Sequence, residues 1–265
     1  MDVLLAGGIF VVAYALIASE RFDRTLVAML GGLLVVLLGI IDQEEAFAGI
    51  DFNVIFLLAG MMILAGGLSR TGFFEFVAGL AIQRSRGQPF RLLVILAVTT
   101  ALLSAVLDNV TTVVLLTPVT LSIARTLKVS PFPYLISQIF ASNIGGTATL
   151  IGDPPNILIG SAAGLDFGDF LVNLAPVVVV TMAVFLAILW LWFGRSMADD
   201  EDRLDVLAEL DPSAAITNRP LMIRSLAVLG LTLVGFLFDS VIGVEAATIA
   251  LLGATVLMIV GPLDP

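Results

Sequence analysis

The sequence has 265 residues, of which 59% are hydrophobic and 13% are charged, with a formal net charge of −10 and neither cysteine nor histidine. This composition excludes an ordinary water-soluble domain, and the acidic balance argues against nucleic acid as a partner. It also excludes disulfides, thiolate ligands and histidine proton switches. We therefore predict an all-α polytopic membrane protein that is surrounded by the lipid bilayer.

The first three apolar segments predict membrane spans at residues 3–19, 24–41 and 52–69, since each is close to the length of about 20 residues that crosses a bilayer. The N-terminus lacks the basic region of a cleaved signal peptide, so we expect the first span to be retained. Residues 72–85 form a shorter amphipathic segment that ends in arginine. We expect this segment to lie along the membrane interface.

Residues 90–127 are apolar at both ends but are interrupted in the middle by the polar run LDNVTT. Arg91 and Arg125 lie at the two ends, so the segment enters and leaves from the same side, as two full spans or as a re-entrant hairpin. A turn exposed to lipid is not tolerated at bilayer depth, whereas a turn lined by protein is. We favour a re-entrant hairpin whose tip stops inside the protein.

Residues 133–160 contain a second interruption, in the run ASNIGGTATLIGDPPN. Gly145 and Gly146 allow a chain to unwind, and proline is favoured at the first position of a helix. We therefore predict a broken helix: a first part that ends at about Ile139, an unwound loop around 142–153, and a new half-helix from Pro154. Asp153 stands at the N-cap position of that half-helix.

The rest of the chain predicts a span at 170–193, an acidic loop at 196–218, and spans at 221–238 and 245–262. Lys and Arg collect in cytoplasmic loops. The loops at 42–51, 161–169 and 239–244 contain neither residue, so an N-terminus on the outside places all 12 positive charges inside. We expect a multi-pass protein of the plasma (inner) membrane in this orientation.

A short internal similarity suggests a repeat. RTLVAMLGGLLVVLLGIID (24–42) resembles AATIALLGATVLMIVGPLD (246–264), and the number of intervening crossings would invert the second copy. We predict a first transporter repeat at 1–195, an acidic cytoplasmic linker at 196–218 and the start of a second repeat at 219–265. The expected product is then a partial chain.

The two interrupted segments supply the candidate binding residues, because exposed backbone at membrane depth is tolerated where it lines a site. These residues are Ser104, Asp108, Asn109, Thr111 and Thr112 from the hairpin, and Ser142, Asn143, Gly145, Gly146, Thr147, Asp153 and Asn156 from the broken helix. Neutral oxygens suit Na⁺, which we place at Asn109, Ser142, Asn143 and Gly145, while the half-helix N-terminus favours an anion. We expect no catalytic residue and no cofactor beyond coupling to Na⁺ or H⁺.

The runs DNVTTVVLLTPVT and ASNIGGTATLIGDPPN resemble the first-repeat signature of the ion transporter superfamily. The resemblance is closest to the branch of arsenite permeases, NhaD-type sodium/proton antiporters and the melanosomal P protein, which is related to the divalent-anion:sodium symporters. It implies a secondary transporter that works by alternating access. It also implies a dimer, and a second hairpin and broken helix in the other repeat.

Two departures from the symporter pattern bear on the substrate. Where those relatives read Ser-Asn-Thr at the hairpin tip, this chain has Asp108, Asn109 and Val110, and where they read Thr-Pro-Pro-Asn it begins with Asp153. A carboxylate at Asp108 would repel a dicarboxylate substrate. The resemblance therefore favours a cation or proton site.

Several alternatives stay open. The preferred function is efflux of arsenite, antimonite or another anion, or sodium/proton antiport; the others are a non-transporting half-subunit that needs a second half, and a sodium symporter for dicarboxylate or citrate. An intramembrane aspartyl protease that uses Asp108 and Asp153 is disfavoured, because Leu150 stands where its Gly-x-Gly-Asp motif needs glycine. Asp108 and Asp153 could instead cap helices, the glycines could serve close packing, and the threonines could bond their own helix.

Overall fold

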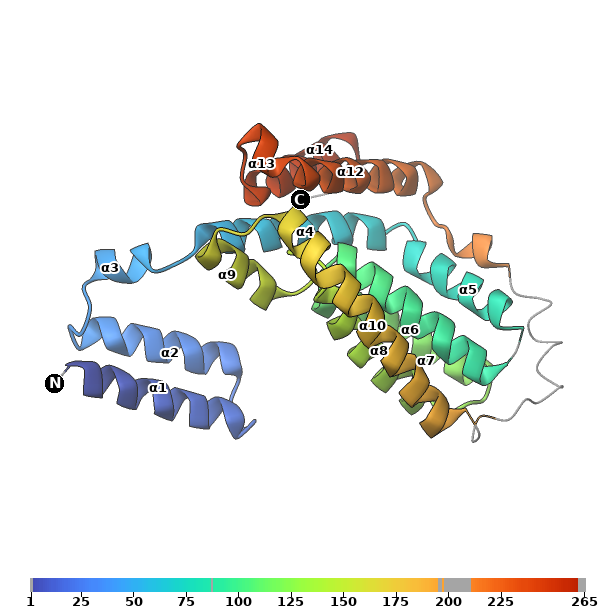
Figure 1. Ribbon diagram of the computed structural model, residues 1–265, viewed down its shortest axis with the longest axis horizontal. Coiled ribbons are helices and arrows are strands. Elements are labelled where there is room, and N and C mark those ends of the chain that lie inside the picture. The colour runs from blue at the N-terminus through green and yellow to red at the C-terminus, as the bar shows by residue number, and fades with distance from the viewer. Residues whose placement is uncertain (1, 87, 195–196, 198–210, 262–265) are drawn as a thin grey trace. The chain divides into compact units, whose positions relative to one another are not determined.

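The computed structural model describes residues 2–86, 88–194, 197 and 211–261 (Figure 1). This described part is all-helical, with no β-strand, which confirms the predicted fold class. The chain divides into two compact units, Met1–Phe52 and Asn53–Pro265.

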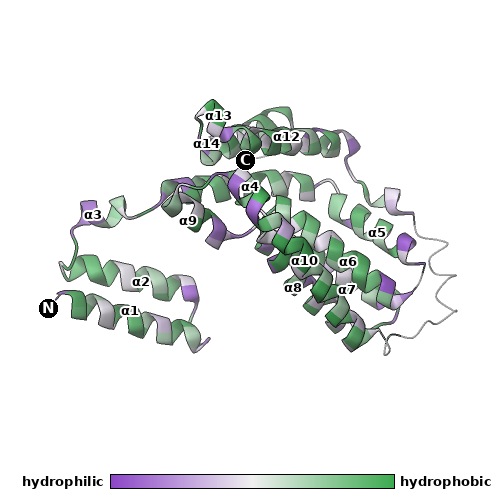
Figure 2. Cartoon of the chain, viewed as in Figure 1, coloured by the Kyte–Doolittle hydropathy of each residue, from purple (hydrophilic) through white to green (hydrophobic). Residues whose placement is uncertain are grey.

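The first unit contains α1 (Asp2–Ala18), α2 (Arg24–Leu37) and α3 (Gln43–Ala48). Helices α1 and α2 lie side by side, and most of their apolar side chains are exposed, as is expected of helices that face lipid (Figure 2). The predicted span 24–41 is shorter than expected, because α2 ends at Leu37 and the backbone turns at Gly39, whose φ is +68°. The sequence did not indicate α3.

The second unit contains the remaining elements. These are α4 (Phe52–Ser69), α5 (Phe73–Ser85), α6 (Pro89–Val106), α7 (Asn109–Thr126), α8 (Phe132–Gly146), α9 (Pro154–Ala163), α10 (Phe167–Phe193), the 3₁₀ turn η2 (Pro212–Ala215), α12 (Arg219–Leu237), α13 (Asp239–Ile242) and α14 (Ala246–Val260). Among the described helices, α4, α6, α10 and α12 are long and apolar enough to cross a membrane. The predicted spans 52–69, 170–193 and 221–238 correspond to α4, α10 and α12, and α4 matches its prediction at both ends, while α6 is the first arm of the segment 90–127 predicted as a re-entrant hairpin.

Helices α6, α7, α8 and α10 form a bundle in which α8 packs most extensively on α6 (Figure 1). Small residues make this contact: Ala97, Ala101 and Ala141 are fully or almost fully buried in the same cluster. A Cβ atom at Gly145 would collide with the main chain of Ala101. Small side chains let membrane helices approach closely, so α6 and α8 form the rigid pair that carries the two interrupted segments.

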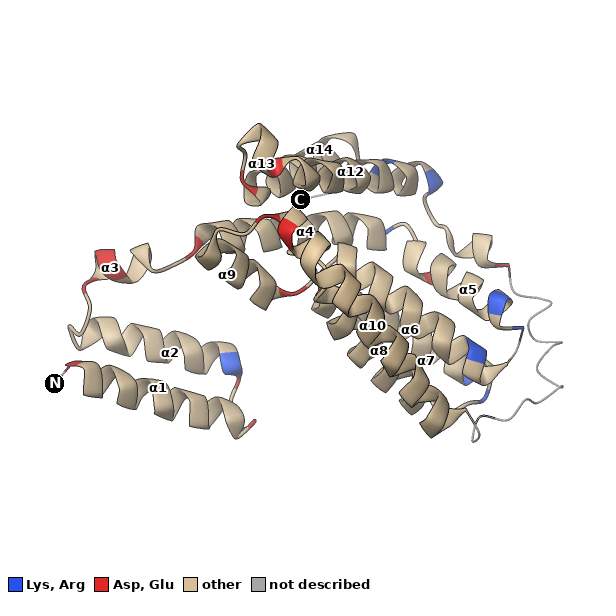
Figure 3. Cartoon of the chain, viewed as in Figure 1, with Lys and Arg blue, Asp and Glu red and all other residues tan. Residues whose placement is uncertain are grey.

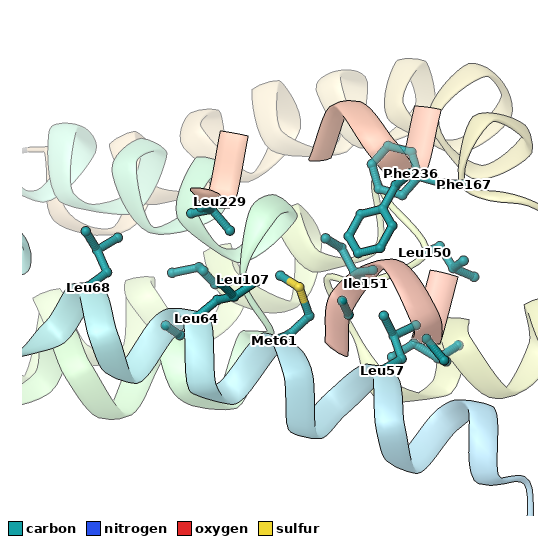
Figure 4. Packing of buried hydrophobic residues seen from close by; sticks show 14 of the residues in the cluster. Leu57, Met61, Leu64, Leu68, Leu107, Leu150, Ile151, Phe167, Leu229 and Phe236 are labelled. Atoms are coloured by element: carbon teal, nitrogen blue, oxygen red, sulfur yellow. The ribbon is translucent and has the colours of Figure 1, made fainter. Parts of the chain in front are cut away.

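Helix α4 buries one face against the region where the interruptions meet. Leu57, Met61, Leu64 and Leu68 recur every three or four residues along it, and they point toward Leu107, Ile151 and Phe236 (Figure 4). On the same helix, Gly60 packs directly against the backbone of Ala250 in α14. Helix α4 thus joins the interrupted segments to the α12–α14 pair.

Part of the predicted linker is folded onto the turn between α4 and α5. The Thr217 amide donates to the Thr71 carbonyl at 3.0 Å, and the Thr217 hydroxyl donates to the Arg70 carbonyl at 3.1 Å. Gly72, with φ of +77°, lies against the Ala215 carbonyl, where a side chain would not fit. Residues 211–217, the described C-terminal part of the predicted linker 196–218, thus pack on this turn, while residues 195–196, 198–210 and 262–265, with Asp264 of the repeat, lie outside the described residues.

The basic residues of the second unit lie near one end of its spans (Figure 3). The described Lys and Arg of this unit lie where α4, α5 and α7 end and where α6 and α12 begin: Arg70, Arg84, Arg86, Arg91, Arg125, Lys128, Arg219 and Arg224. Asp166 and Asp169 begin α10, Asp239 follows α12, and Glu245 precedes α14. The basic residues therefore gather at one end of the spans, as loops on one side of a membrane do.

Candidate functional site

The two interruptions predicted from the sequence meet in the structure. Leu107 and Asp108 separate α6 from α7, and residues 147–153 separate α8 from α9. The Asn109 amide donates to the Gly152 carbonyl at 3.0 Å, which joins the hairpin tip to the break through main-chain atoms. The Thr149 hydroxyl adds a bond of 2.6 Å to the Ala105 carbonyl, so backbone groups freed at one interruption are satisfied by the other.

Side chains tie the hairpin to α8 at the same level. Asn109 Nδ2 donates to Asn143 Oδ1 at 3.0 Å, and the Ser104 hydroxyl donates to the Ser142 carbonyl at 2.7 Å. Two oxygen atoms in the first turn of α7, Asn109 Oδ1 and Thr112 Oγ1, are buried without a hydrogen-bond partner. A buried oxygen that lacks a donor is available to a cation or to water.

The break starts later than the sequence indicated. Helix α8 continues to Gly146, seven residues beyond Ile139, so Ser142 and Asn143 are helical and the unwound part covers only 147–153. The glycines serve close packing: Gly145 lies against Ala101, and Gly146 lies against Gly152 with the Ser104 hydroxyl nearby. Tight contact with α6 keeps these residues helical despite the low helix propensity of glycine.

The two aspartates differ in their local roles. Asp108 caps α7, because its carboxylate accepts a hydrogen bond of 2.7 Å from the Thr111 amide. Asp153 occupies the N-cap position of α9, as the sequence indicated, but its side chain makes no cap hydrogen bond, which does not favour the alternative of capping alone. Its carboxylate instead interacts with the Asn109 side chain by a hydrogen bond and with Asp108 by charge repulsion. The tip therefore gathers two carboxylates around one amide.

The other candidate residues brace the site. Asn156 Nδ2 donates to the Thr149 carbonyl at 2.9 Å and to the Gly146 carbonyl at 3.3 Å, which closes the break across its ends. The Thr147 and Ser142 hydroxyls both donate to carbonyls of α8 itself. Those two hydroxyls follow the alternative in which the side chain bonds its own helix.

Residues 14–265 match the protein family described as Citrate transporter. The chain belongs to the citrate transporter family.

Relatives agree with this assignment. The chain is 45% identical to an uncharacterized transporter of Mycobacterium bovis over 98% of its own length, 44% identical to a 46 kDa membrane protein of Mycobacterium leprae over 98%, and 39% identical to the human P protein over 76%. It spans 61% and 62% of the two mycobacterial proteins and 25% of the P protein. Of these three relatives, one is named as a transporter and one as a membrane protein.

The site of this citrate transporter family member is acidic. It contains Asp108 and Asp153, and none of the described Lys or Arg residues lies in the tip or the break. The described residues hold no group of three acidic, histidine or cysteine side chains that could bind a metal ion. Amide, hydroxyl and carbonyl oxygens near carboxylates suit a hard monovalent cation or a proton.

A separate cavity of about 340 Å³ opens at the acidic end of the second unit, between α9, α13 and the start of α14. Asp166, Asp239 and Glu245 line it. Burial raises the pKa of Asp239, and the charges of Asp166 and Asp169 raise it further, against hydrogen bonds from the Ser240 and Phe167 amides. No local pattern in the sequence indicates this cavity, because it depends on α4, α9, α13 and α14 coming together.

Sequence reasoning missed Thr120 and Gln138 as members of the polar framework, whereas Thr149 stood out as a polar residue of the interrupted run. Thr149 links the break to α6 and accepts a bond of 3.2 Å from the Gly152 amide. Thr120 and Gln138 bond to each other between α7 and α8. The available signal was Gln138 itself, a lone amide in the apolar run YLISQIFAS of this family member.

Proposed function

We propose that this citrate transporter family member is part of a secondary transporter that binds Na⁺ or H⁺ between the hairpin tip and the break. The observation that carries the proposal is the position of Asn109. Its backbone bonds to Gly152, its Nδ2 bonds to Asn143, and its Oδ1 is buried and unpartnered. A residue held by both interrupted segments, with one oxygen free, is well placed to bind an ion that stabilises their union.

For Na⁺, the free oxygens of Asn109 and Thr112 and the exposed Asn143 amide are the first ligands to consider. Ser142 and Gly145 contribute by holding α8 against α6, since the Ser142 carbonyl accepts from the Ser104 hydroxyl and Gly145 packs on Ala101, while the Gly145 carbonyl accepts from the Ala148 amide of the break. For H⁺, Asp108 and Asp153 are the acceptors, because the chain has no histidine.

The transport cycle follows from the resemblance to two-repeat transporters. We propose that residues 1–195 form the first repeat, that residues 219–265 begin the second, inverted repeat, and that the acidic segment 196–218 is cytoplasmic. The second hairpin and broken helix would come from further sequence, from a separate second half or from a dimer partner. The gathering of basic residues at one end supports an N-terminus outside the inner membrane.

Arsenite or antimonite efflux and sodium/proton antiport are the transport reactions that best fit an acidic site without thiolates. A second candidate is citrate or dicarboxylate symport, which the family description favours. The charges of Asp108 and Asp153 oppose it, because an anionic substrate would approach two carboxylates without a described Lys or Arg in the site. A cation bound at Asn109 would have to offset that repulsion.

Proteoliposomes test the proposal, made with the chain and any further sequence that its gene encodes. We expect an Na⁺ or H⁺ gradient to drive the flux of arsenite, of antimonite or of the exchanged cation. Asn109→Ala should abolish this flux while the protein still inserts into the membrane. The matched control is Val110→Ala, since Val110 is the adjacent, exposed residue. Citrate uptake that needs neither gradient, or wild-type flux in Asn109→Ala, would contradict the cation site.

A further inference from the structure

A second polar contact lies between α7 and α8, away from the hairpin tip. Gln138 on α8 is 2% exposed and Thr120 on α7 is 1% exposed. The Thr120 hydroxyl donates to Gln138 Oε1 at 2.9 Å. The other end of the same amide, Gln138 Nε2, is buried and has no hydrogen-bond partner.

An amide N–H that is buried without an acceptor is destabilising, and such groups in folded proteins are nearly always paired with protein or water. We propose that Gln138 Nε2 and Thr120 Oγ1 bind a buried water molecule between α7 and α8. The water accepts a hydrogen bond from Nε2 and donates one to Thr120 Oγ1, whose own proton goes to Gln138 Oε1. Every polar atom of the pair then has a partner.

The unpaired Nε2–H group of Gln138 also determines which kind of ligand can bind there. An N–H donor needs an acceptor, so it repels a cation such as Na⁺. An anion at this position would need a buried positive partner, and none of the described buried side chains is Lys or Arg. A neutral water molecule satisfies the donor without introducing charge.

A plain interhelical bond does not explain the arrangement. Polar side chains often hold membrane helices together, but the Thr120 bond uses only one end of the amide. Two other buried hydroxyls of the bundle are satisfied by protein alone: Thr100 donates to the Leu96 carbonyl at 2.7 Å and Ser137 to the Pro133 carbonyl at 2.6 Å, each in its own helix. Gln138 differs from these two residues because one end of its amide has no protein partner.

The water site lies on the path of α7 from the tip to the basic end of the bundle. Thr112 and Thr120 are two turns apart on the buried face of α7, about 12 Å along its axis. In transport, the bound water would offer a polar position between the tip and that end. That role rests on the proposed function, whereas the water site itself does not.

Radiolytic oxidation of single thiols tests the site, since hydroxyl radicals formed from bound water oxidise a thiol in contact with it. The wild-type chain has no cysteine, so Thr120→Cys and the matched control Thr100→Cys each carry one thiol in the intact protein. We expect the thiol at position 120, whose S–H can still bond to the water, to be oxidised at least about tenfold faster than that at 100, and Gln138→Leu to remove the difference. Equal rates in the two variants, or a fast rate that survives Gln138→Leu, would overturn the proposal.

Stability gives a second measurement in case the double variant folds poorly. If the amide holds water, Gln138→Met alone lowers the folding equilibrium constant in detergent about fivefold to tenfold, because a complete hydrogen-bond network is lost. If no water is bound, Gln138→Met loses the Thr120 bond but also removes the unpaired buried N–H, so stability is unchanged or rises, and the water site is rejected. Ser137→Ala is the control, since that buried hydroxyl bonds only within α8.

Discussion

Helix α8 meets its two neighbours through different kinds of side chain. Against α6 it presents small residues, and Gly145 touches the main chain of Ala101; the hydrogen bonds between these two helices, from Ser104 and Tyr134, go to backbone carbonyls. Against α7 it presents amides, with Asn143 bonded to Asn109 and Gln138 bonded to Thr120. Separating closely packed small residues loses their van der Waals contacts without replacement. A hydrogen bond between two helices can instead be replaced by a bond to water or to an ion. The α6–α8 contact is thus suited to a fixed frame, and the α7–α8 contact to binding.

The largest effect is expected from breaking the α6–α8 contact with Gly145→Ala. The added Cβ meets the Ala101 carbonyl, a backbone group that moves only with the whole helix, so we expect a loss of about 2–3 kcal/mol in the free energy of unfolding. Thermal unfolding in detergent, followed by circular dichroism, measures it. Gly66→Ala in α4 is the control: a Cβ there meets nothing within 4 Å, and alanine should be neutral or stabilising. Equal stability of the two variants would mean that the α6–α8 contact is not tight.

The next effect concerns the α7–α8 contact at the tip. We expect Asn109→Ala to weaken Na⁺ binding at least about tenfold, which is about 1.4 kcal/mol, because the free oxygen and the bond to Asn143 are both lost. Unfolding should change less than in Gly145→Ala, since Asn143 is exposed and can bond to water. Isothermal titration with NaCl at constant ionic strength measures the affinity. An unchanged affinity beside a large loss of stability would make Asn109 a structural residue.

The same contrast shows what the sequence could and could not predict. Apolar length gave the helices, and the polar runs gave the two interruptions, because charge and proline are costly inside a bilayer wherever they occur. The break was placed too early, since Gly145 and Gly146 are consistent with either unwinding or close packing, and only the position of α6 decides between them. The folded segment 211–217, the Asp239 cavity and the Thr120–Gln138 bond depend on residues distant in sequence, which no local pattern reports.

A smaller effect is expected at the Thr120–Gln138 bond. Thr120→Val removes a hydroxyl that bonds across the seam, and we expect a loss of about 1 kcal/mol in the free energy of unfolding. Thr117→Val is the matched control on the same helix, because that hydroxyl donates to the Val113 carbonyl of α7 itself, at 2.7 Å. Its expected change is below about 0.5 kcal/mol. If both variants lose the same stability, the loss comes from placing valine in a helix and not from losing the Thr120–Gln138 bond.

The smallest expected effect on stability is at Asp239, which lies outside the α6–α8 and α7–α8 contacts and which, unlike them, titrates. Asp239 has a raised pKa, from burial first and from Asp166 and Asp169 second, so its charged form is disfavoured in the folded state. The stability that it contributes is present below the pKa of the unfolded carboxyl and is lost as the pH rises through the folded pKa. Asp239→Asn should therefore slightly raise the melting temperature at pH 7 and lose this advantage below about pH 4.

The Thr120–Gln138 contact contains only hydroxyl and amide groups, so the loss of stability in Thr120→Val should be the same at both pH values. A pH-dependent loss in Thr120→Val, measured in the same series, would show that the α7–α8 seam is coupled to a carboxylate, with Asp108 at the start of α7 as the first to examine.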